Sequence, residues 1–398
     1  MSTSIQPLRS YFATGATQSY AFRIEQLQRL KKAVLDAEKE LYQALYADLK
    51  KTQEDAWATE IGFFLSELNH TIKNLKQWME PTSVATNLVN LPSASFIVQE
   101  PLGVVCIIAP WNYPFQLLFT PLIGAIAGGN CAVLKPSEFA PATAAVMQKI
   151  IHSLFSDNYI MYIEGEGAAV LPPLLTENRF DHIFYTGSTL VGKIIYKLAA
   201  EQLVPVTLEL GGKSPAVICE DANLRVAARR LANPKFSNCG QMCIAPDYIL
   251  VPPALKDKLI EELIIAIQAF YGKEAEASEH YGKIINEKQW LRLNAYLGDG
   301  EIVYGGKSNK EKLFIEPTIM VGVSPEAKIM QDEIFGPLLP ILTYESKEEA
   351  LSIIQKNPNP LAFYVFAENK NDQQYWLTNV PSGGACINKD RKSTRLNS

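Results

Sequence analysis

The chain has 398 residues, of which 47% are hydrophobic and 20% are charged, so it is long enough to form two domains with ordinary packed cores. Its 37 Lys and Arg residues against 42 Asp and Glu give a formal net charge of -5, and no dense basic stripe with interleaved aromatic residues occurs. This composition indicates a soluble globular protein and argues against nucleic acid as a partner.

The cellular compartment is predicted from what the sequence lacks. The N-terminus has no apolar region of the signal-peptide kind, and no stretch approaches the roughly 20 apolar residues of a membrane span. We therefore expect a cytoplasmic protein, in which scattered cysteines stay reduced. Each cysteine is then either core packing or chemistry, and the six are Cys106, Cys131, Cys219, Cys239, Cys243 and Cys386.

The N-terminal part of the chain is predicted to be helical. Apolar residues at three-, four- and seven-residue spacings indicate one long amphipathic helix over residues 22–50, and a second helix runs roughly over residues 55–79. Pro81 ends the second helix. Two short strands, around residues 85–89 and 95–99, then predict a projecting hairpin.

A regular alternation of short apolar strands with helices follows. The strands are GVVCIIAP, CAVL, IMYIEG, FDHIFYTG and PVTLEL, and most are separated by helical segments. Doubly apolar strands of this kind predict a parallel sheet covered on both faces. From Gly212 a second α/β region begins, so we place the domain change near residues 209–212.

Polar residues follow four of the predicted strands at the point where each strand ends. They are Asn112, the Lys135 to Glu138 segment, the Gly187-Ser188 turn and Glu209. Ligands of open α/β sheets bind beyond the carboxyl ends of the strands. One cleft could therefore gather all four.

The segment GSTLVGKI, from Gly187 to Ile194, nearly matches a phosphate-binding P-loop and lies between a predicted strand and a predicted helix. A P-loop needs Ser or Thr where Ile194 stands, and no partner acid for magnesium is evident, so a nucleotide hydrolase is disfavoured. The turn would still present backbone N–H groups to a dinucleotide pyrophosphate. The glycine equally well serves only to shape a strand-to-helix turn.

Cys239 and Cys243 lie in a polar, glycine-bearing loop before an apolar strand, where structural thiols are less expected. Zinc would need further Cys or His ligands at regular spacing, and the four histidines are far away in sequence, so no metal site is expected. From the residues alone, Cys243 is either a nucleophile or a small buried hydrophobic residue.

Six motifs occur in the order PWNYP, LKPSE, FYTGSTLVGK, VTLELGGKSP, KFSNCGQMCIAPDY and EIFGPLLPI. Together they resemble the aldehyde dehydrogenase superfamily, and most closely its class-3, fatty-aldehyde-type branch. The likeness extends from about Tyr11 to Asn388. It implies the oxidation of apolar aliphatic or aromatic aldehydes to carboxylic acids, with NAD as the cofactor and NADP possible.

The resemblance also implies the catalytic roles. Cys243 would attack the aldehyde, and the Asn112 side chain with the Cys243 N–H would hold the thiohemiacetal oxyanion. Glu209 would activate water to attack the thioester, a task for which its carboxylate needs a raised pKa. The alternative interpretation of Glu209 is a carboxylate at the end of a strand that forms a salt bridge. A catalytically dead relative is disfavoured because all three residues are present.

The cofactor site follows from the same resemblance. Lys135 and Glu138 would grip the adenosine ribose, where the carboxylate favours NAD, and Ser188 would touch the pyrophosphate. Glu333 and Phe335 would position the nicotinamide ribose and ring, although EIFGP is otherwise only a turn. In the helix predicted after the PWNYP motif, the apolar residues Phe115 and Leu118 lie one turn apart and would either line an aldehyde tunnel or pack in the core.

The expected organisation is a Rossmann-like dinucleotide-binding domain over residues 1–81 and 103–208, an oligomerisation hairpin over residues 82–102 and a catalytic domain over residues 209–389. The resemblance implies a homodimer for the full-length form and a further C-terminal segment past Asn388, so we expect a truncated chain. Whether a membrane anchor follows stays open. Residues 390–398 have three cations and no apolar periodicity, which favours a non-native tail, or a short charged natural one.

Overall fold

The computed structural model describes residues 4–388, and the expected tail from Asp390 to Ser398 lies outside them. The chain forms two compact units. The first contains residues up to Asp48 and from Gln53 to Glu209, and the second contains Leu49–Thr52 and the chain from Leu210. This division is close to the predicted change at residues 209–212, whereas the functional names of the domains stay predictions.

The first unit begins with a set of helices. They are α1 (Gln6–Ala13), α2 (Tyr20–Asp36), α3 (Glu38–Leu49), α4 (Gln53–Ala56), a π-helical turn (Trp57–Ile61) and α5 (Gly62–Trp78). The predicted single helix over residues 22–50 is wrong, because Ala37 leaves the helical conformation with ψ near 5°. Glu38 and Glu40 then favour a new helix start at α3. Within residues 4–388, no helix has the combined length and apolarity needed to cross a membrane.

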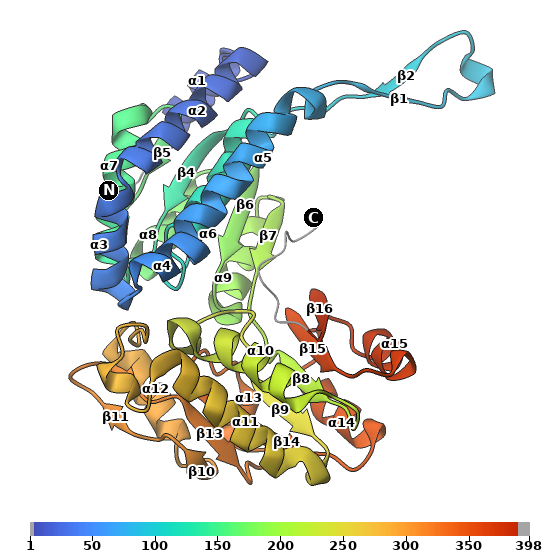
Figure 1. Ribbon diagram of the computed structural model, residues 1–398. Helices are drawn as coiled ribbons and strands as arrows, with labels where there is room; N and C mark the ends of the chain where they lie inside the picture. The colour runs from blue at the N-terminus through green and yellow to red at the C-terminus, as the bar shows by residue number, and fades with distance from the viewer. Residues whose placement is uncertain (1–3, 389–398) are drawn as a thin grey trace. The chain divides into compact units, whose positions relative to one another are not determined.

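The predicted hairpin is confirmed, but one of its strands was misplaced. β1 (Thr82–Val84) pairs antiparallel with β2 (Ser95–Ile97), and Figure 1 shows this hairpin extending beyond the end of α5. The expected strand at residues 85–89 does not form. Asn87 instead accepts the Val89 N–H at 3.1 Å and caps a 3-10 turn over Leu88–Asn90.

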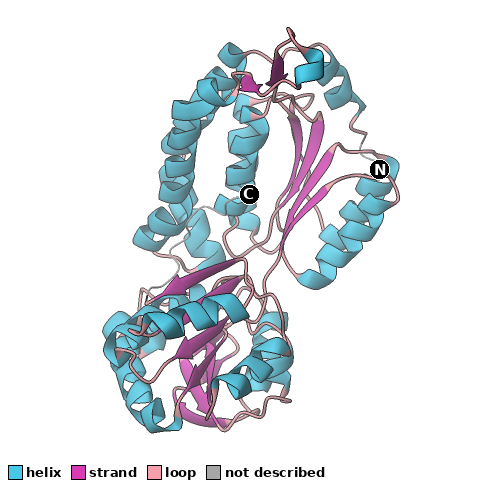
Figure 2. Cartoon of the chain, turned by 90° about the vertical axis from the view of Figure 1, so that its right-hand side faces the viewer, coloured by secondary structure: helices cyan, strands magenta, loops and turns pink. Residues whose placement is uncertain are grey.

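A five-stranded sheet forms the centre of the first unit (Figures 1 and 2). Its strands are β3 (Val104–Ile108), β4 (Cys131–Lys135), β5 (Ile160–Tyr162), β6 (His182–Thr186) and β7 (Val206–Glu209). The order is β5-β4-β3-β6-β7 and every pair is parallel, so all carboxyl ends lie at one edge. After β3, the strands β4 and β5 are added toward one edge of the sheet, and β6 and β7 are then added toward the other edge. The strand order therefore reverses between β3 and β6, which is the topological switch point of the sheet.

Helices follow each of these strands except the last. They are α6 (Gln116–Ala127), α7 (Pro141–Leu154), α8 (Gly167–Glu177) and α9 (Thr189–Ala200), and Figure 2 shows helices on both faces of the sheet. β3 and β4 are buried along their whole length, as their unbroken apolar sequences require. The predicted α/β class with a parallel Rossmann-like sheet is therefore confirmed.

The second unit contains a seven-stranded sheet in the order β10-β13-β14-β9-β8-β15-β16. Only β10 is antiparallel to its neighbour, so the predicted second α/β region is confirmed. The strands are β8 (Pro215–Ile218), β9 (Tyr248–Val251), β10 (Glu301–Tyr304), β13 (Thr318–Val321), β14 (Leu338–Thr343), β15 (Ala362–Phe366) and β16 (Gly384–Ile387), with a separate pair formed by β11 (Ser308–Asn309) and β12 (Phe314–Ile315).

Helices connect the strands of the second unit. They are α10 (Leu224–Phe236), α11 (Pro253–Tyr271), α12 (Glu287–Tyr296), α13 (Lys328–Gln331), α14 (Lys347–Gln355) and α15 (Lys370–Asn379), with 3-10 turns at Ser237–Gly240 and Ala275–Ala277. α10 and α11 pack against each other, and β8, β9 and β15 are fully buried. The core of the unit thus lies around the central strands.

Candidate active site

The first unit carries six of the nine predicted site residues at one edge of its sheet. Asn112 follows β3, the segment from Lys135 to Glu138 follows β4, the turn from Gly187 follows β6, and Glu209 ends β7. These four strands are consecutive neighbours and parallel. Their carboxyl ends therefore bring the predicted groups side by side along the edge where ligands of such sheets bind.

Lys135 and Glu138 form a local pair after β4. The Lys135 side chain is 2% exposed, and its Nζ donates to the Pro136 carbonyl at 2.6 Å and lies 3.4 Å from Glu138 Oε2. The other carboxylate oxygen, Glu138 Oε1, accepts the Gly167 N–H at 2.9 Å, at the start of α8. Burial acts to raise the pKa of Glu138, but the Gly167 hydrogen bond and Lys135 outweigh it and lower that pKa. The carboxylate is therefore held ionised.

The turn after β6 exposes backbone donors. Ser188 caps α9 by accepting the Val191 N–H at 3.4 Å, whereas the N–H groups of Thr189 and Leu190 have no acceptor among residues 4–388. Leu190 is 72% exposed, so this helix N-terminus is open. A Cβ at Gly187 would meet the Tyr185 hydroxyl, so a larger residue there would force the Tyr185 side chain to shift. Free N–H groups at an open helix N-terminus fit a pyrophosphate group.

The loop between β3 and α6 carries Asn112, whose side chain is 3% exposed. The loop ends where the carboxylate of Glu60 accepts the N–H groups of Phe115 and Gln116, each at 3.0 Å. Phe115 and Leu118 are completely buried, and the Phe115 ring packs against other rings, which favours the core-packing interpretation of this pair. Sequence analysis missed Glu60, although a carboxylate inside an apolar helical stripe was a signal.

The second unit carries Cys243 in the loop between α10 and β9. Asn238 and Cys239 adopt left-handed backbone conformations with φ of 49° and 54°, and Gly240 has φ of 70°. A Cβ at Gly240 would collide with the carbonyl oxygen of Gly336, in the EIFGP segment. Glycine therefore lets the cysteine loop lie directly against the segment that carries Glu333 and Phe335.

Gln241 holds this loop in place, and sequence analysis did not predict that role. Its side chain is buried, and Nε2 donates to the carbonyl oxygens of Asn238 at 3.0 Å and Lys283 at 2.9 Å. Its Oε1 accepts the Ile285 N–H at 2.9 Å. Three hydrogen bonds from a buried amide fix the backbone two residues before Cys243.

The cysteines differ in exposure. Cys243 is partly exposed, as is Cys386 in β16, and the other four are buried. Burial raises the pKa of Cys239 to about 12, although a hydrogen bond with Tyr281 acts to lower it. A thiol of that kind is inert at neutral pH. Within residues 4–388 no cluster of three or more His, Cys, Asp or Glu side chains could hold a metal ion.

A buried ion pair organises the EIFGP segment. Lys213 Nζ contacts Asp247 Oδ2 and donates to the carbonyl oxygens of Ile329 at 2.7 Å and Asp332 at 3.0 Å. Asp247 Oδ1 accepts the Ile334 N–H at 2.9 Å. From the other side, Arg292 Nη2 donates to the Ile334 carbonyl at 2.7 Å. The backbone between Glu333 and Phe335 is thus fixed by charged groups.

Glu333 is held in an unusual environment. Its carboxylate lies against Gly211, where a Cβ would collide with it. Burial, with help from Asp247, raises the pKa of Glu333 to about 8, against the opposing Gly212 hydrogen bond and the cations Lys213 and Arg292. Phe335 has a left-handed backbone with φ of 49°. Such strain is typical of positions that serve a ligand.

Comparison with known proteins adds evidence of a different kind. Residues 5–397 match the model of the aldehyde dehydrogenase family. The 4,4'-diaponeurosporen-aldehyde dehydrogenase of Staphylococcus aureus is 47% identical over 96% of this chain and 83% of its own length. The dimeric NADP-preferring aldehyde dehydrogenase of Rattus norvegicus is 41% identical over 98% of this chain and 85% of its own length. Both relatives are thus matched over most of their sequence.

Solved structures agree with this match. The substrate-bound Staphylococcus aureus AldH superimposes with a TM-score of 0.95 at 46% identity, covering 97% of this chain and 84% of that chain. An indole-3-acetaldehyde dehydrogenase in complex with NAD+ superimposes with a TM-score of 0.88 at 28% identity, covering 98% and 81%. With the family model matched along nearly the whole sequence and the same fold in both structures, the chain belongs to the aldehyde dehydrogenase family and is an NAD(P)-dependent enzyme that oxidises aldehydes to carboxylic acids.

Proposed function

We propose that this enzyme oxidises apolar aliphatic or aromatic aldehydes, with Cys243 as the nucleophile. The observation that carries the proposal is the contrast between two neighbouring thiols. Cys239 is completely buried with its pKa raised to about 12, whereas Cys243 is partly exposed in a loop that Gln241 fixes through three hydrogen bonds. A fixed and accessible thiol is what a covalent mechanism needs.

In the proposed mechanism Cys243 loses its thiol proton to solvent, and the thiolate sulfur attacks the aldehyde carbon to form a thiohemiacetal. The Asn112 side-chain amide and the Cys243 N–H stabilise the oxyanion that develops on the former carbonyl oxygen. A bound nicotinamide would supply the acceptor for the hydride that leaves the aldehyde carbon, and loss of the hydride would leave a thioester on Cys243. Glu209 then takes a proton from water, which attacks the thioester, and the carboxylic acid leaves with the thiol restored.

Five groups of the chain are proposed to hold the cofactor. Lys135 and Glu138 bind the adenosine ribose hydroxyls, and the Gly187-Ser188 turn with the open N–H groups of α9 binds the pyrophosphate. Glu333 and Phe335 position the nicotinamide ribose and ring. Since Glu138 is held ionised, it repels a phosphate on the ribose, and we propose a preference for NAD over NADP.

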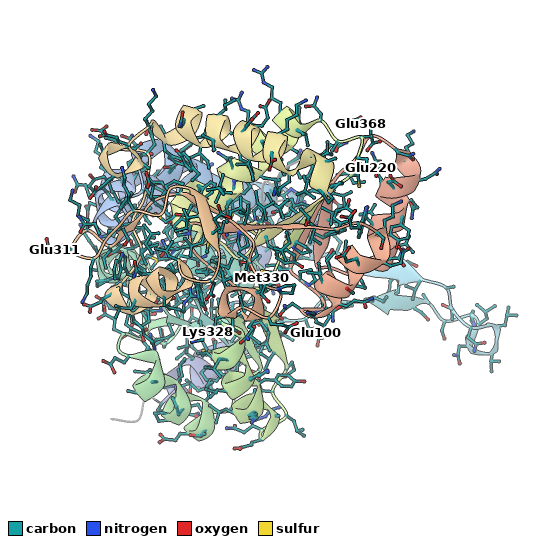
Figure 3. All side chains as sticks on the ribbon, turned by 90° about the horizontal axis from the view of Figure 1, so that it is seen from below. Glu100, Glu220, Glu311, Lys328, Met330 and Glu368 are labelled. Atoms are coloured by element: carbon teal, nitrogen blue, oxygen red, sulfur yellow. The ribbon has the colours of Figure 1, made fainter. Side chains whose placement is uncertain are left out.

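We also propose that the enzyme is a homodimer that pairs through its hairpin. Leu88 is 82% exposed and Val89 is 87% exposed, and both lie at the tip of the segment between β1 and β2. Phe96 on β2 is 58% exposed. Figure 3 shows this hairpin, with its side chains, projecting from the rest of the first unit. Exposed apolar residues clustered on one hairpin indicate a protein interface.

An NADH-formation assay tests the proposed chemistry. Decanal and benzaldehyde are supplied with NAD, and we expect turnover from the wild-type chain and less than about a thousandth of it from Cys243→Ala, the scale of removing a catalytic nucleophile. Cys239→Ala serves as the matched control and retains turnover. Tight NAD binding by Cys243→Ala, measured by fluorescence titration, shows that the variant is folded. Activity in Cys243→Ala would overturn the assignment.

A further inference from the structure

Glu60 is a completely buried carboxylate in a helical face whose other buried residues are mostly apolar. The buried residues of this face include Ala56, Ile61, Phe64 and Leu68, and Glu60 stands one turn before Phe64. It lies in the π-helical turn Trp57–Ile61, between α4 and α5. Burying a carboxylate is costly unless hydrogen bonds compensate it. π-helical turns of this kind are frequent at functional sites.

The compensation comes from the start of α6. Glu60 Oε2 accepts the N–H groups of Phe115 and Gln116, each at 3.0 Å. Phe115 is the N-cap residue and Gln116 the first residue of a twelve-residue helix, whose first N–H groups have no acceptors within the helix and whose dipole favours an anion. The ring of Phe64 packs on that of Phe115 with centroids 5.2 Å apart. Phe115 is therefore fixed by its backbone and by its ring.

The same contact fixes one end of the Asn112 loop. At the other end, the Ala109 N–H donates to the Lys135 carbonyl at 3.1 Å and continues the sheet. Asn112 lies between these two anchors, three residues before Phe115. The first anchor is part of the sheet, and the carboxylate of Glu60 forms hydrogen bonds at the second. A shift at Phe115 would move Asn112 directly.

We propose that Glu60 is a positioning residue for Asn112: its carboxylate fixes the start of α6 and so holds the Asn112 amide where the oxyanion forms. Glu60 does not contact the substrate in this role. The inference rests on the proposed role of Asn112 as an oxyanion donor. It gives the buried carboxylate and its π-helical turn a function in the chemical step.

The effect on rate separates positioning from a purely structural role. A loss of oxyanion alignment lowers kcat, whereas a loss of packing lowers stability and leaves the kcat of the folded fraction intact. Asp181 provides the matched control. Its Oδ2 accepts the Val104 N–H at 2.7 Å at the amino end of the same strand, β3, and it pairs with Arg9. Asp181→Ala thus removes a comparable carboxylate at the amino end of β3, whereas Asn112 follows the carboxyl end of this strand.

The test is a double-mutant cycle with saturating NAD and aldehyde. We expect Glu60→Ala to lower kcat by about ten- to hundredfold, the scale of a misplaced catalytic group, with the KM for NAD unchanged. In an Asn112→Ala background the same substitution should change kcat by less than about twofold, because coupled residues are not additive. Glu60→Gln keeps an acceptor within reach and should recover kcat to within about threefold of wild type. Asp181→Ala should destabilise the chain and retain kcat.

Amide hydrogen exchange gives a readout that does not depend on turnover. Exchange at Phe115 and Gln116 should accelerate in Glu60→Ala and stay slow at residues 104–108. Unchanged exchange at Phe115 and Gln116 would overturn the proposal, as would additive losses in the cycle or a Glu60→Gln variant as slow as Glu60→Ala. If Asn112→Ala kept the wild-type kcat, the proposed role of Asn112 would fail together with this inference. If Asn112→Ala lost turnover and Glu60→Ala did not, only this inference would fail.

Discussion

The N–H of Gly187 donates to the carbonyl oxygen of Glu209 at 3.0 Å, across the ends of β6 and β7. Thr186 faces Glu209 in the register of these strands. The turn proposed for the pyrophosphate is therefore hydrogen-bonded to the backbone of the residue whose side chain is proposed as the general base. In the proposed mechanism, cofactor binding and thioester hydrolysis would both depend on this backbone contact, so a test of either role should use a substitution that leaves the contact in place.

Alkylation should distinguish the thiols. We expect iodoacetamide to modify Cys243 first, because it is partly exposed and is the proposed nucleophile, and to leave Cys239 unmodified in the native protein, because burial raises its pKa to about 12. Peptide mass spectrometry at short times measures the order. Cys386 is the internal reference, since it is partly exposed but lies in a strand. Modification of Cys239 before Cys243 would contradict the prediction.

Glu209→Gln should separate the two halves of the reaction. The amide keeps the shape of the side chain and the backbone bond to Gly187, but it cannot take a proton from water. We expect a rapid burst of NADH equal to the enzyme concentration, followed by stalled turnover, in stopped-flow measurements.

The control for this experiment is Glu201→Gln, at the exposed end of α9, which should turn over normally. A Glu209→Gln variant without a burst would place Glu209 in a step before the thioester forms.

Glu138 should set the cofactor preference. Glu138→Gln removes the charge and keeps an acceptor for the Gly167 N–H, so kcat/KM for NADP relative to NAD should rise by about fivefold, which corresponds to roughly 1 kcal/mol for two like charges about 4 Å apart in water. Steady-state kinetics with both cofactors measures the ratio. Glu164→Gln is the control, because that carboxylate bonds Gln148 at the surface. Equal efficiency with both cofactors in the wild type would refute the preference.

Glu333 should make stability depend on pH. Its pKa is raised from 4.5 to about 8, so between these pH values the folded chain holds a proton that the unfolded chain has released. The free energy of unfolding therefore falls as pH rises through this window. Glu333→Gln removes this contribution, and denaturant titrations between pH 5 and about 8 should show a smaller fall than in the wild type.

Glu311→Gln is the matched control for this measurement. Glu311 is exposed in the loop between β11 and β12 and is labelled in Figure 3. Its substitution should leave the wild-type pH dependence in place. An identical slope in Glu333→Gln and the wild type would show that Glu333 ionises normally.

The hairpin should control assembly. Replacing Leu88 and Val89 together by Asp puts two charges on side chains that are 82% and 87% exposed, and we expect size-exclusion chromatography with light scattering to show a monomer. Leu203→Asp, at a site that is 86% exposed after α9, is the control and should leave the dimer intact. A wild-type chain that is monomeric at micromolar concentration would refute the proposed dimer.

Much of the fold was predictable because strands and helices of an α/β sheet carry local patterns. The unbroken apolar sequence of β3 and β4 indicates strands buried on both faces, and the structure confirms both. Local patterns failed at Ala37, where the apolar stripe continues but the helix breaks, and at α8, where Pro172 and Pro173 conceal a helix that was not predicted.

The sequence by itself determined which residues lie at the carboxyl ends of the strands, because Asn112 and Gly187 come after apolar segments and Lys135 and Glu209 end them. Only the tertiary structure decided what holds them. The Glu60 contact with Phe115 joins residues 55 apart in sequence, and Gln241 reaches Lys283 across 42 residues. Such contacts depend on how whole elements pack, so the local pattern can show that Glu60 interrupts an apolar face but not which residue it contacts.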